Sequence, residues 1–187
     1  MKSLKQFMEE LSMVTIVMIG GPGSGKSTYS KYISGHFDIP HIYTGDMMRD
    51  LQKKDPEVAK IMDRGDLVPI EKVMKALKDR LGKDDTDNGY ILDGFPRNMK
   101  QLTRMKQENI DYKYVVYLNV SEKEVIKRLT ARGRKDDKPE IIKQRLREHE
   151  KQVGPVIKHY EDQLINIKAE GAEPEVIANK IIKRIER

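Results

Sequence analysis

The stretch MVTIVMIGGPGSGKST, residues 13–28, joins a continuous apolar run to a glycine-rich loop. The apolar run is typical of a strand that is buried on both faces of a parallel sheet. Gly20 is followed by four residues and then by Gly25, Lys26 and Ser27, which matches the spacing G-x-x-x-x-G-K-[ST] between a strand and a helix. This order predicts an α/β fold in which a phosphate site follows the first strand.

Each residue type in this loop suits the binding of an anion. Glycines let the backbone wind tightly and turn its N–H groups inward, and the following helix presents its positive N-terminus to the same point. Lys26 is expected to reach the outer phosphates, and the Ser27 hydroxyl to join the shell of a Mg²⁺ ion. The triphosphate-binding residues expected in this loop, called the P-loop below, are Gly21, Gly23, Ser24, Gly25, Lys26, Ser27 and Thr28.

Apolar runs alternate with helical patterns along the rest of the chain. Further strands are expected at 41–46, 89–95, 114–120 and 164–169. Helices are expected at roughly 46–53, 56–64, 67–81, 121–132, 140–164 and 174–187. Strands that alternate with helices build βαβ units, so we expect one domain over 1–187 with three α/β/α layers around a central parallel sheet.

Two local features make sharper predictions within these helices. Ser121, with Glu124 three residues later, has the spacing of a capping box at a helix start. Gly154 and Pro155 should break or kink the long helical pattern that contains them.

Composition excludes several classes of site. The chain has no cysteine, which rules out disulfides, cysteine-ligated zinc and a thiol nucleophile. Its histidines lack metal-ligand spacing and are interpreted as ordinary surface or core residues. They are His36, His41, His149 and His159.

The formal net charge of +6 permits binding to phosphates, nucleic acid or acidic membranes without choosing among them. Aromatic residues make up only 6% of the chain and no known nucleic-acid motif is present, so we expect no nucleic-acid partner. No apolar run approaches the ~20 residues that span a bilayer, and glutamates stand where a signal peptide would be apolar. We expect a cytoplasmic protein with no membrane partner.

Two further motifs narrow the kind of nucleotide protein. YTGDMMRD (43–50) and LDGFPRNMKQ (92–101) each follow an expected strand, and no guanine-reading N-K-x-D stretch is found. Asp93 ends its strand where its carboxylate can hold Mg²⁺ through water beside the P-loop. With these motifs the chain resembles the adenylate kinases, within the nucleoside-monophosphate kinase family. The resemblance covers about 13–183 and includes GGPGSGKST, TGDMMR, MDRGDLVP, LDGFPRNMKQ, RKDD and GPVIKHY in the family's order.

The resemblance implies Mg²⁺-dependent transfer of a phosphoryl group from ATP to AMP, giving two ADP. Arg49 and Arg97 would clamp the monophosphate, while Thr44 and Gln101 would read adenine. The implied AMP-binding residues are Thr44, Arg49, Met62, Leu67, Val68, Gly94, Arg97 and Gln101. Asn98 stands where pyrimidine-monophosphate kinases also carry asparagine, so CMP, UMP or GMP stay open as further acceptors. The monophosphate-binding arm, about 43–72, is shorter than the family's usual arm.

A short lid, about 131–141, is implied over ATP, with no room for the zinc-stabilised insert of long-lid members. Arg128 would lie near the ATP adenine, while Arg132, Arg134 and Arg145 would contact the phosphates, with Arg132 and Arg134 able to exchange tasks. The backbone at Glu173 would contact the adenine. Asp136 and Asp137 would pair with the lid arginines, fix the hinge or form a solvated turn. The expected catalytic residues are Lys26, Arg97, Arg132, Arg134 and Arg145.

An apolar stripe marks the N-terminal segment 1–12. Its members lie at the helical spacing i, i+3, i+4 and i+7 and are Leu4, Phe7, Met8 and Leu11. A helix here would pack on its own domain or form a homo-oligomer. The alternative to a kinase is a P-loop RNA-associated NTPase, against which the paired monophosphate motifs argue.

Overall fold

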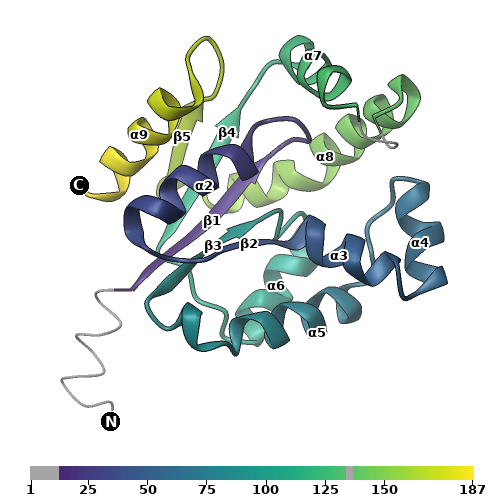
Figure 1. The fold of residues 1–187 in the computed structure, drawn as a ribbon, viewed down its shortest axis with the longest axis horizontal. Coiled ribbons are helices and arrows are strands. Elements are labelled where there is room, and N and C mark those ends of the chain that lie inside the picture. Colours follow the sequence, from purple (N-terminus) through teal and green to yellow (C-terminus); the bar gives the residue numbers. More distant parts are fainter. Residues whose placement is uncertain (1–12, 134–136) are drawn as a thin grey trace.

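The computed structural model describes residues 13–133 and 137–187, in which a sheet of parallel strands lies between two layers of helices (Figure 1). The strands are β1 (Val14–Gly20), β2 (His41–Tyr43), β3 (Gly89–Asp93), β4 (Tyr114–Asn119) and β5 (Leu164–Lys168). The helices are α2 (Lys26–Phe37), α3 (Thr44–Gln52), α4 (Pro56–Asp63), α5 (Ile70–Leu81), α6 (Met99–Gln107), α7 (Glu122–Arg132), α8 (Pro139–His159) and α9 (Pro174–Ile185), with 3₁₀ turns at Asp84–Thr86 and Glu161–Gln163. The expected three-layer α/β fold is confirmed.

Some of the predictions lie outside the described residues. They concern the helix over 1–12 and the lid residues Arg134 and Asp136. In the parts of the chain that the structure describes, no helix is long and apolar enough to cross a membrane.

The strand order is β2-β3-β1-β4-β5, which places β1 at the centre of the sheet. Met18 of β1 lies opposite Asp93 of β3, and Gly20 lies opposite Leu118 of β4. The connection after β1 leads to β2 on one side of the sheet, and the connection after β3 leads to β4 on the other side. Open α/β sheets bind ligands in the crevice that forms at such a divergence, beyond the carboxyl ends of the strands. The P-loop begins there.

Successive side chains of β1 enter two different cores, because a strand points alternate residues to opposite faces. Val17 and Ile19 pack in the cluster that contains residues of α3, α5, α6 and α8. Ile16 and Met18 pack in the cluster built with α2 and α9, which lie side by side. Burial on both faces explains why this strand is a continuous apolar run rather than an alternating one.

Several element boundaries differ from the prediction. The helix expected over 140–164 ends at His159, and the strand expected over 89–95 ends at Asp93. The strand expected over 41–46 ends at Tyr43, and α3 begins at Thr44, whose hydroxyl donates to the Asp93 carbonyl at 2.9 Å. The helix expected from residue 67 begins at Ile70, because Pro69 has an extended conformation (φ −50°, ψ 138°) and disfavours helix in the residue before it.

The helix is not broken at Gly154 and Pro155, because α8 runs without interruption through both residues, while the kink, the other expectation, stays a prediction. Both residues lie on its exposed side, while Val153, Val156 and the following Tyr160 are buried. Packing of the buried side therefore outweighs the hydrogen bond that proline removes on the solvent side.

The capping box is also wrong. Ser121 makes no side-chain cap hydrogen bond, and its hydroxyl instead donates to Glu170 Oε2 at 2.9 Å. Glu124 accepts from Arg128 Nε at 2.8 Å. Glu170, which the fold brings close, and Arg128, an i,i+4 neighbour on α7, are thus the partners of these two side chains in place of the local cap.

Candidate functional site

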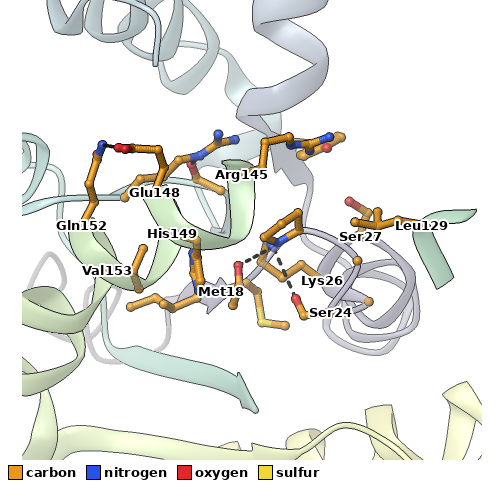
Figure 2. Close-up of a pocket in the computed structure, with 18 of the residues that line it drawn as sticks. Met18, Ser24, Lys26, Ser27, Leu129, Arg145, Glu148, His149, Gln152 and Val153 are labelled. Atoms are coloured by element: carbon orange, nitrogen blue, oxygen red, sulfur yellow. Dashed lines mark hydrogen bonds between the residues drawn. The ribbon is translucent and has the colours of Figure 1, made fainter. Parts of the chain in front are cut away.

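A cavity of about 480 Å³ opens beyond the carboxyl ends of β1 and β3. The P-loop forms one wall, and the loop containing Gly94 and Arg97 forms the next. The last turns of α7, the middle of α8 and the segment 65–67 complete the enclosure. Figure 2 shows Arg145 and His149 on α8 and Ser24 and Lys26 on the P-loop wall.

The backbone of the P-loop is tightly constrained. Gly25 has φ +94°, and a Cβ atom there would lie 2.7 Å from the ring of Tyr29. Lys26 Nζ donates to the carbonyls of Gly20 at 2.7 Å and Gly21 at 2.9 Å. The lysine is thus held across the loop, at the N-terminus of α2, where a helix favours anions.

A buried carboxylate lies beside this lysine. Asp93 Oδ2 accepts a hydrogen bond from Ser27 Oγ at 2.7 Å and lies 3.1 Å from His41 Nε2. Burial alone would raise the pKa of Asp93, but His41, Lys26 and Ser27 outweigh it and hold the pKa below its usual range. Asp93 is therefore an ionised acceptor inside the protein.

The second carboxylate oxygen of Asp93, Oδ1, is buried and has no hydrogen-bond partner among the described residues. An ionised oxygen with unused acceptor capacity beside a serine hydroxyl suits Mg²⁺ or a water in its shell. The described residues contain no group of three or more His, Cys, Asp or Glu side chains that could hold a metal. An ion here would take its remaining ligands from water and phosphate oxygens, as Mg²⁺ commonly does.

Cations from three different segments converge on the cavity. Burial lowers the pKa of Lys26 and Arg97, and Arg145 lowers both further, although Asp93 opposes the shift. Burial also lowers the pKa of His149 to about 4, with Lys26 and Arg97 adding to the effect. Charged forms that disfavour one another across a cavity are relieved by a polyanion, so the arrangement suits phosphates.

The residues around Gly94 interlock. Arg97 Nε donates to the Gly94 carbonyl at 2.7 Å, and the Arg97 N–H donates to Gln101 Oε1 at 2.7 Å. Gly94 has φ +83°, and a Cβ atom there would lie 2.9 Å from Thr44 Oγ1. Thr44 and Gln101 therefore support Gly94 and Arg97 from behind the cavity wall.

The lid arginines are held by side-chain pairs. Arg132 Nε and Nη2 donate to the two carboxylate oxygens of Asp137 at 2.8 and 2.6 Å, and Arg145 Nη1 lies 3.7 Å from the same carboxylate. The Asp137 side chain is 1% exposed. The expected pairing of Asp137 with lid arginines is thus present.

Arg128 bridges the two ends of the expected triphosphate site. It donates to the carbonyls of Ser24 at 3.3 Å and Ala169 at 2.9 Å, and its Nε pairs with Glu124. It thereby links α7 to the P-loop and to the segment after β5.

The structure brings most of the expected site residues to one cavity. Those that line it are Gly23, Ser24, Gly25, Lys26, Ser27, Thr28, Leu67, Gly94, Arg97, Arg128, Arg132 and Arg145. Those that do not are Gly21, Thr44, Arg49, Met62, Val68, Asp93, Gln101 and Glu173. Asp93 is buried behind the wall and Glu173 is exposed at the start of α9.

Two of the histidines interpreted as ordinary residues lie at the site. His149 lines the cavity, and its ring lies 3.4 Å from the position of a Cβ atom on Gly21. His41 contacts the Asp93 carboxylate. A signal for His149 exists in the sequence, since it follows Arg145 by four residues and so shares its helix face.

Tyr43 also lines the cavity and was not among the expected site residues. It ends β2 immediately before the TGD motif.

Comparison with known proteins agrees with this geometry. The family described as adenylate kinase matches residues 18–165. An adenylate kinase of Corynebacterium diphtheriae is 37% identical over 174 residues, which cover 89% of this chain and 96% of the relative. An adenylate kinase of Mycobacterium sp. is 35% identical over the same shares. One of Thermosipho africanus is 35% identical, over 79% of this chain and 87% of the relative.

Proposed function

The chain belongs to the adenylate kinase family, and from this premise we propose how its residues transfer a phosphoryl group reversibly from ATP to AMP. The protein is a phosphotransferase that converts ATP and AMP into two ADP. The observation that carries the assignment of roles is the convergence of Lys26, Arg97 and Arg145 on one cavity. Phosphoryl transfer needs positioning and charge neutralisation more than covalent chemistry, and these cations supply both.

The P-loop wall is assigned to the triphosphate. Backbone N–H groups of 21–28 would surround the phosphates while Lys26 exchanges its carbonyl partners for the outer phosphates. Adenylate kinases use ATP with Mg²⁺, which neutralises charge on the transferring group. Ser27 would hold the ion directly and Asp93 partly through water, as the unused Asp93 Oδ1 supports.

The wall that contains Gly94 and Arg97 is assigned to AMP, together with an arm over about 43–72. Arg97 and Arg49 would clamp its phosphate, because a guanidinium binds two oxygens at once and stays charged. Thr44 and Gln101 would select adenine. Apolar side-chain contacts and main-chain contacts to the base of AMP would come from Met62, Leu67, Val68 and Gly94.

The lid, over about 131–141, is assigned to closure over ATP. Arg132 and Arg145 would leave Asp137 for the phosphates, and Arg134 would join them. Closure by a short segment excludes water from the transferring group. Arg128 and the backbone at Glu173 would lie at the adenine.

A coupled assay of ADP formation tests the assignment. With ATP and Mg²⁺ we expect the highest kcat/KM with AMP, compared with CMP, UMP and GMP. Arg97→Ala should lower kcat by about 10²- to 10³-fold. The control is Arg104→Ala, an exposed arginine of α6 that pairs with Glu108 and does not line the cavity. A normal rate in Arg97→Ala would contradict the assignment.

The relatives named above, all adenylate kinases, favour neither of the other functions considered. Equal rates with all four monophosphates would indicate a broad-specificity kinase. Hydrolysis that RNA stimulates and AMP does not affect would indicate an RNA-associated NTPase. An oligomer formed through the N-terminal stripe stays a prediction, which light scattering of a chain lacking residues 1–11 tests.

A further inference from the structure

Tyr43 stands at the junction of the two substrate walls. It is the last residue of β2, and α3 begins directly after it. Its side chain lines the cavity together with Gly94 and Arg97. The roles assigned above make no use of it.

The ring of Tyr43 has a fixed position. A Cβ atom on Gly45 would lie 2.6 Å from Tyr43 Cζ and 2.7 Å from its hydroxyl oxygen, so the ring occupies space that only glycine leaves open. On another side the ring stacks on His41, with centroids 6.1 Å apart and planes inclined by 16°. His41 is itself held at the Asp93 carboxylate.

This ring contributes to the placement of Arg49. The guanidinium carbon of Arg49 lies 5.1 Å from the centroid of the Tyr43 ring, within the range of a cation–π interaction. Arg49 Nε donates to Asp46 Oδ1 at 3.0 Å, and Nη2 contacts the same oxygen. The guanidinium of Arg49 is thus held by two contacts, one with the ring of Tyr43 and one with the carboxylate of Asp46.

The hydroxyl of Tyr43 lies among cations. Burial would raise the pKa of Tyr43, but Arg49 and Lys26 outweigh burial and Asp93, so the pKa lies below its usual value. Tyr43 also interacts electrostatically with Arg97, since it partly opposes the lowering of the Arg97 pKa by burial. The hydroxyl therefore shares the field of three cations that come from α2, α3 and the loop after β3.

We propose that Tyr43 is a binding residue of the monophosphate site, in which the ring orients Arg49 and the hydroxyl donates a hydrogen bond to the phosphate of the acceptor nucleotide. This inference rests on the proposed function, since it deepens the recognition of AMP by the same cavity. A hydroxyl in the field of three cations lies where an anion is attracted, and it adds a hydrogen-bond donor that is neutral. The neutral donor increases the number of hydrogen bonds to phosphate without further repulsion among the cations.

Two substitutions separate the ring from the hydroxyl. Tyr43→Phe keeps the ring and removes the hydroxyl, so the KM for AMP should rise about tenfold, the scale of one hydrogen bond to a charged group. The KM for ATP and the thermal midpoint should stay near wild-type values. Tyr43→Ser also removes the ring from Arg49 and should raise the KM for AMP further. The matched control is Tyr32→Phe, a tyrosine of α2 that is 44% exposed.

Calorimetric titration with AMP and with adenosine identifies the phosphate as the partner. Tyr43→Phe should weaken AMP binding about tenfold and leave adenosine binding unchanged. Equal weakening of both ligands, or an unchanged affinity for AMP, would overturn the proposal. A wild-type protein that forms no ADP from ATP and AMP would overturn the proposed function instead, and the ratio of AMP to adenosine affinity would still test Tyr43.

Discussion

Two walls of the cavity, the P-loop wall and the lid wall formed by α7 and α8, keep their conformations in different ways. On the P-loop wall the backbone itself is fixed, since Gly25 has a left-handed conformation against Tyr29, and only the Lys26 side chain would exchange partners. On the lid wall Arg132 and Arg145 share one buried carboxylate, Asp137. Side-chain pairs can be exchanged for phosphate contacts, whereas a wound backbone is already in its binding form. The comparison separates a preformed site from one that must rearrange.

The largest effect is expected at the preformed wall. Lys26→Met should lower kcat by about 10²- to 10³-fold, because the transferring group loses a positioned cation. The coupled ADP assay measures this change. Lys31→Met, an exposed lysine on the same helix, is the control and should keep a wild-type rate. A kcat for Lys26→Met within threefold of wild type would show that this wall does not stabilise the transition state.

A backbone substitution tests the preformed wall without changing charge. Gly25→Ala should lower the free energy of unfolding by about 1–3 kcal/mol, because alanine at φ +94° is strained and its Cβ meets Tyr29. Gly35→Ala lies inside α2, and its Cβ meets no atom within 4 Å, so this variant should raise the free energy of unfolding by about 0.5–1 kcal/mol. Urea unfolding measures both, and equal shifts in the two variants would refute a strained loop.

At the lid wall a substitution is expected to strengthen nucleotide binding while it weakens the fold. Asp137→Asn weakens the pairs with Arg132 and Arg145, so less interaction free energy is lost when these arginines leave residue 137 to bind phosphate. We expect the Kd for ATP to fall by about three- to tenfold, while the free energy of unfolding falls by about 1–3 kcal/mol. Calorimetric titration and urea unfolding measure the two changes, with the exposed Asp79→Asn as control. Weaker ATP binding in Asp137→Asn would contradict an exchangeable pair.

The last prediction concerns the pH dependence of stability and His149, whose ring lies between α8 and the P-loop. The folded-state pKa of His149, about 4, lies below its unfolded value of about 6.5. Between these values the unfolded chain binds more protons, so stability is present above pH 6.5 and is lost as the pH falls toward 4.

In His149→Gln this loss should be absent. Between pH 7 and pH 5 the variant should lose about 2 kcal/mol less unfolding free energy than wild type. Urea unfolding at both pH values measures the difference. Identical losses in the two proteins would mean that the ring is not held neutral between the walls.

The sequence predicts the preformed wall better than the lid wall, for a physical reason. The strand, the glycines, Lys26 and Asp93 are specified by local order, because a tight loop between a buried strand and a helix has few solutions. On the lid side the sequence predicts that Asp137 pairs with lid arginines, but which arginines these are depends on how α7 and α8 pack, which no local pattern specifies.

The errors have the same origin. Ser121 bonds to Glu170, which lies 49 residues away, and so departs from the local capping rule. Pro155 is tolerated because α8 is held by its buried side. His149 and Tyr43 are single residues whose importance comes from the segments that the fold places around them.

The cluster of mutually repelling cations has a consequence for the protein's lifetime. Lys26, Arg97 and Arg145 belong to three segments that face one another across the cavity, so a bound polyphosphate acts as a cross-link among them. A ligand present at 100 times its Kd adds about 2.7 kcal/mol to the unfolding free energy. Resistance to proteolysis should therefore rise and fall with the nucleotide pool, which would make the survival of the enzyme a readout of the adenylates that it interconverts.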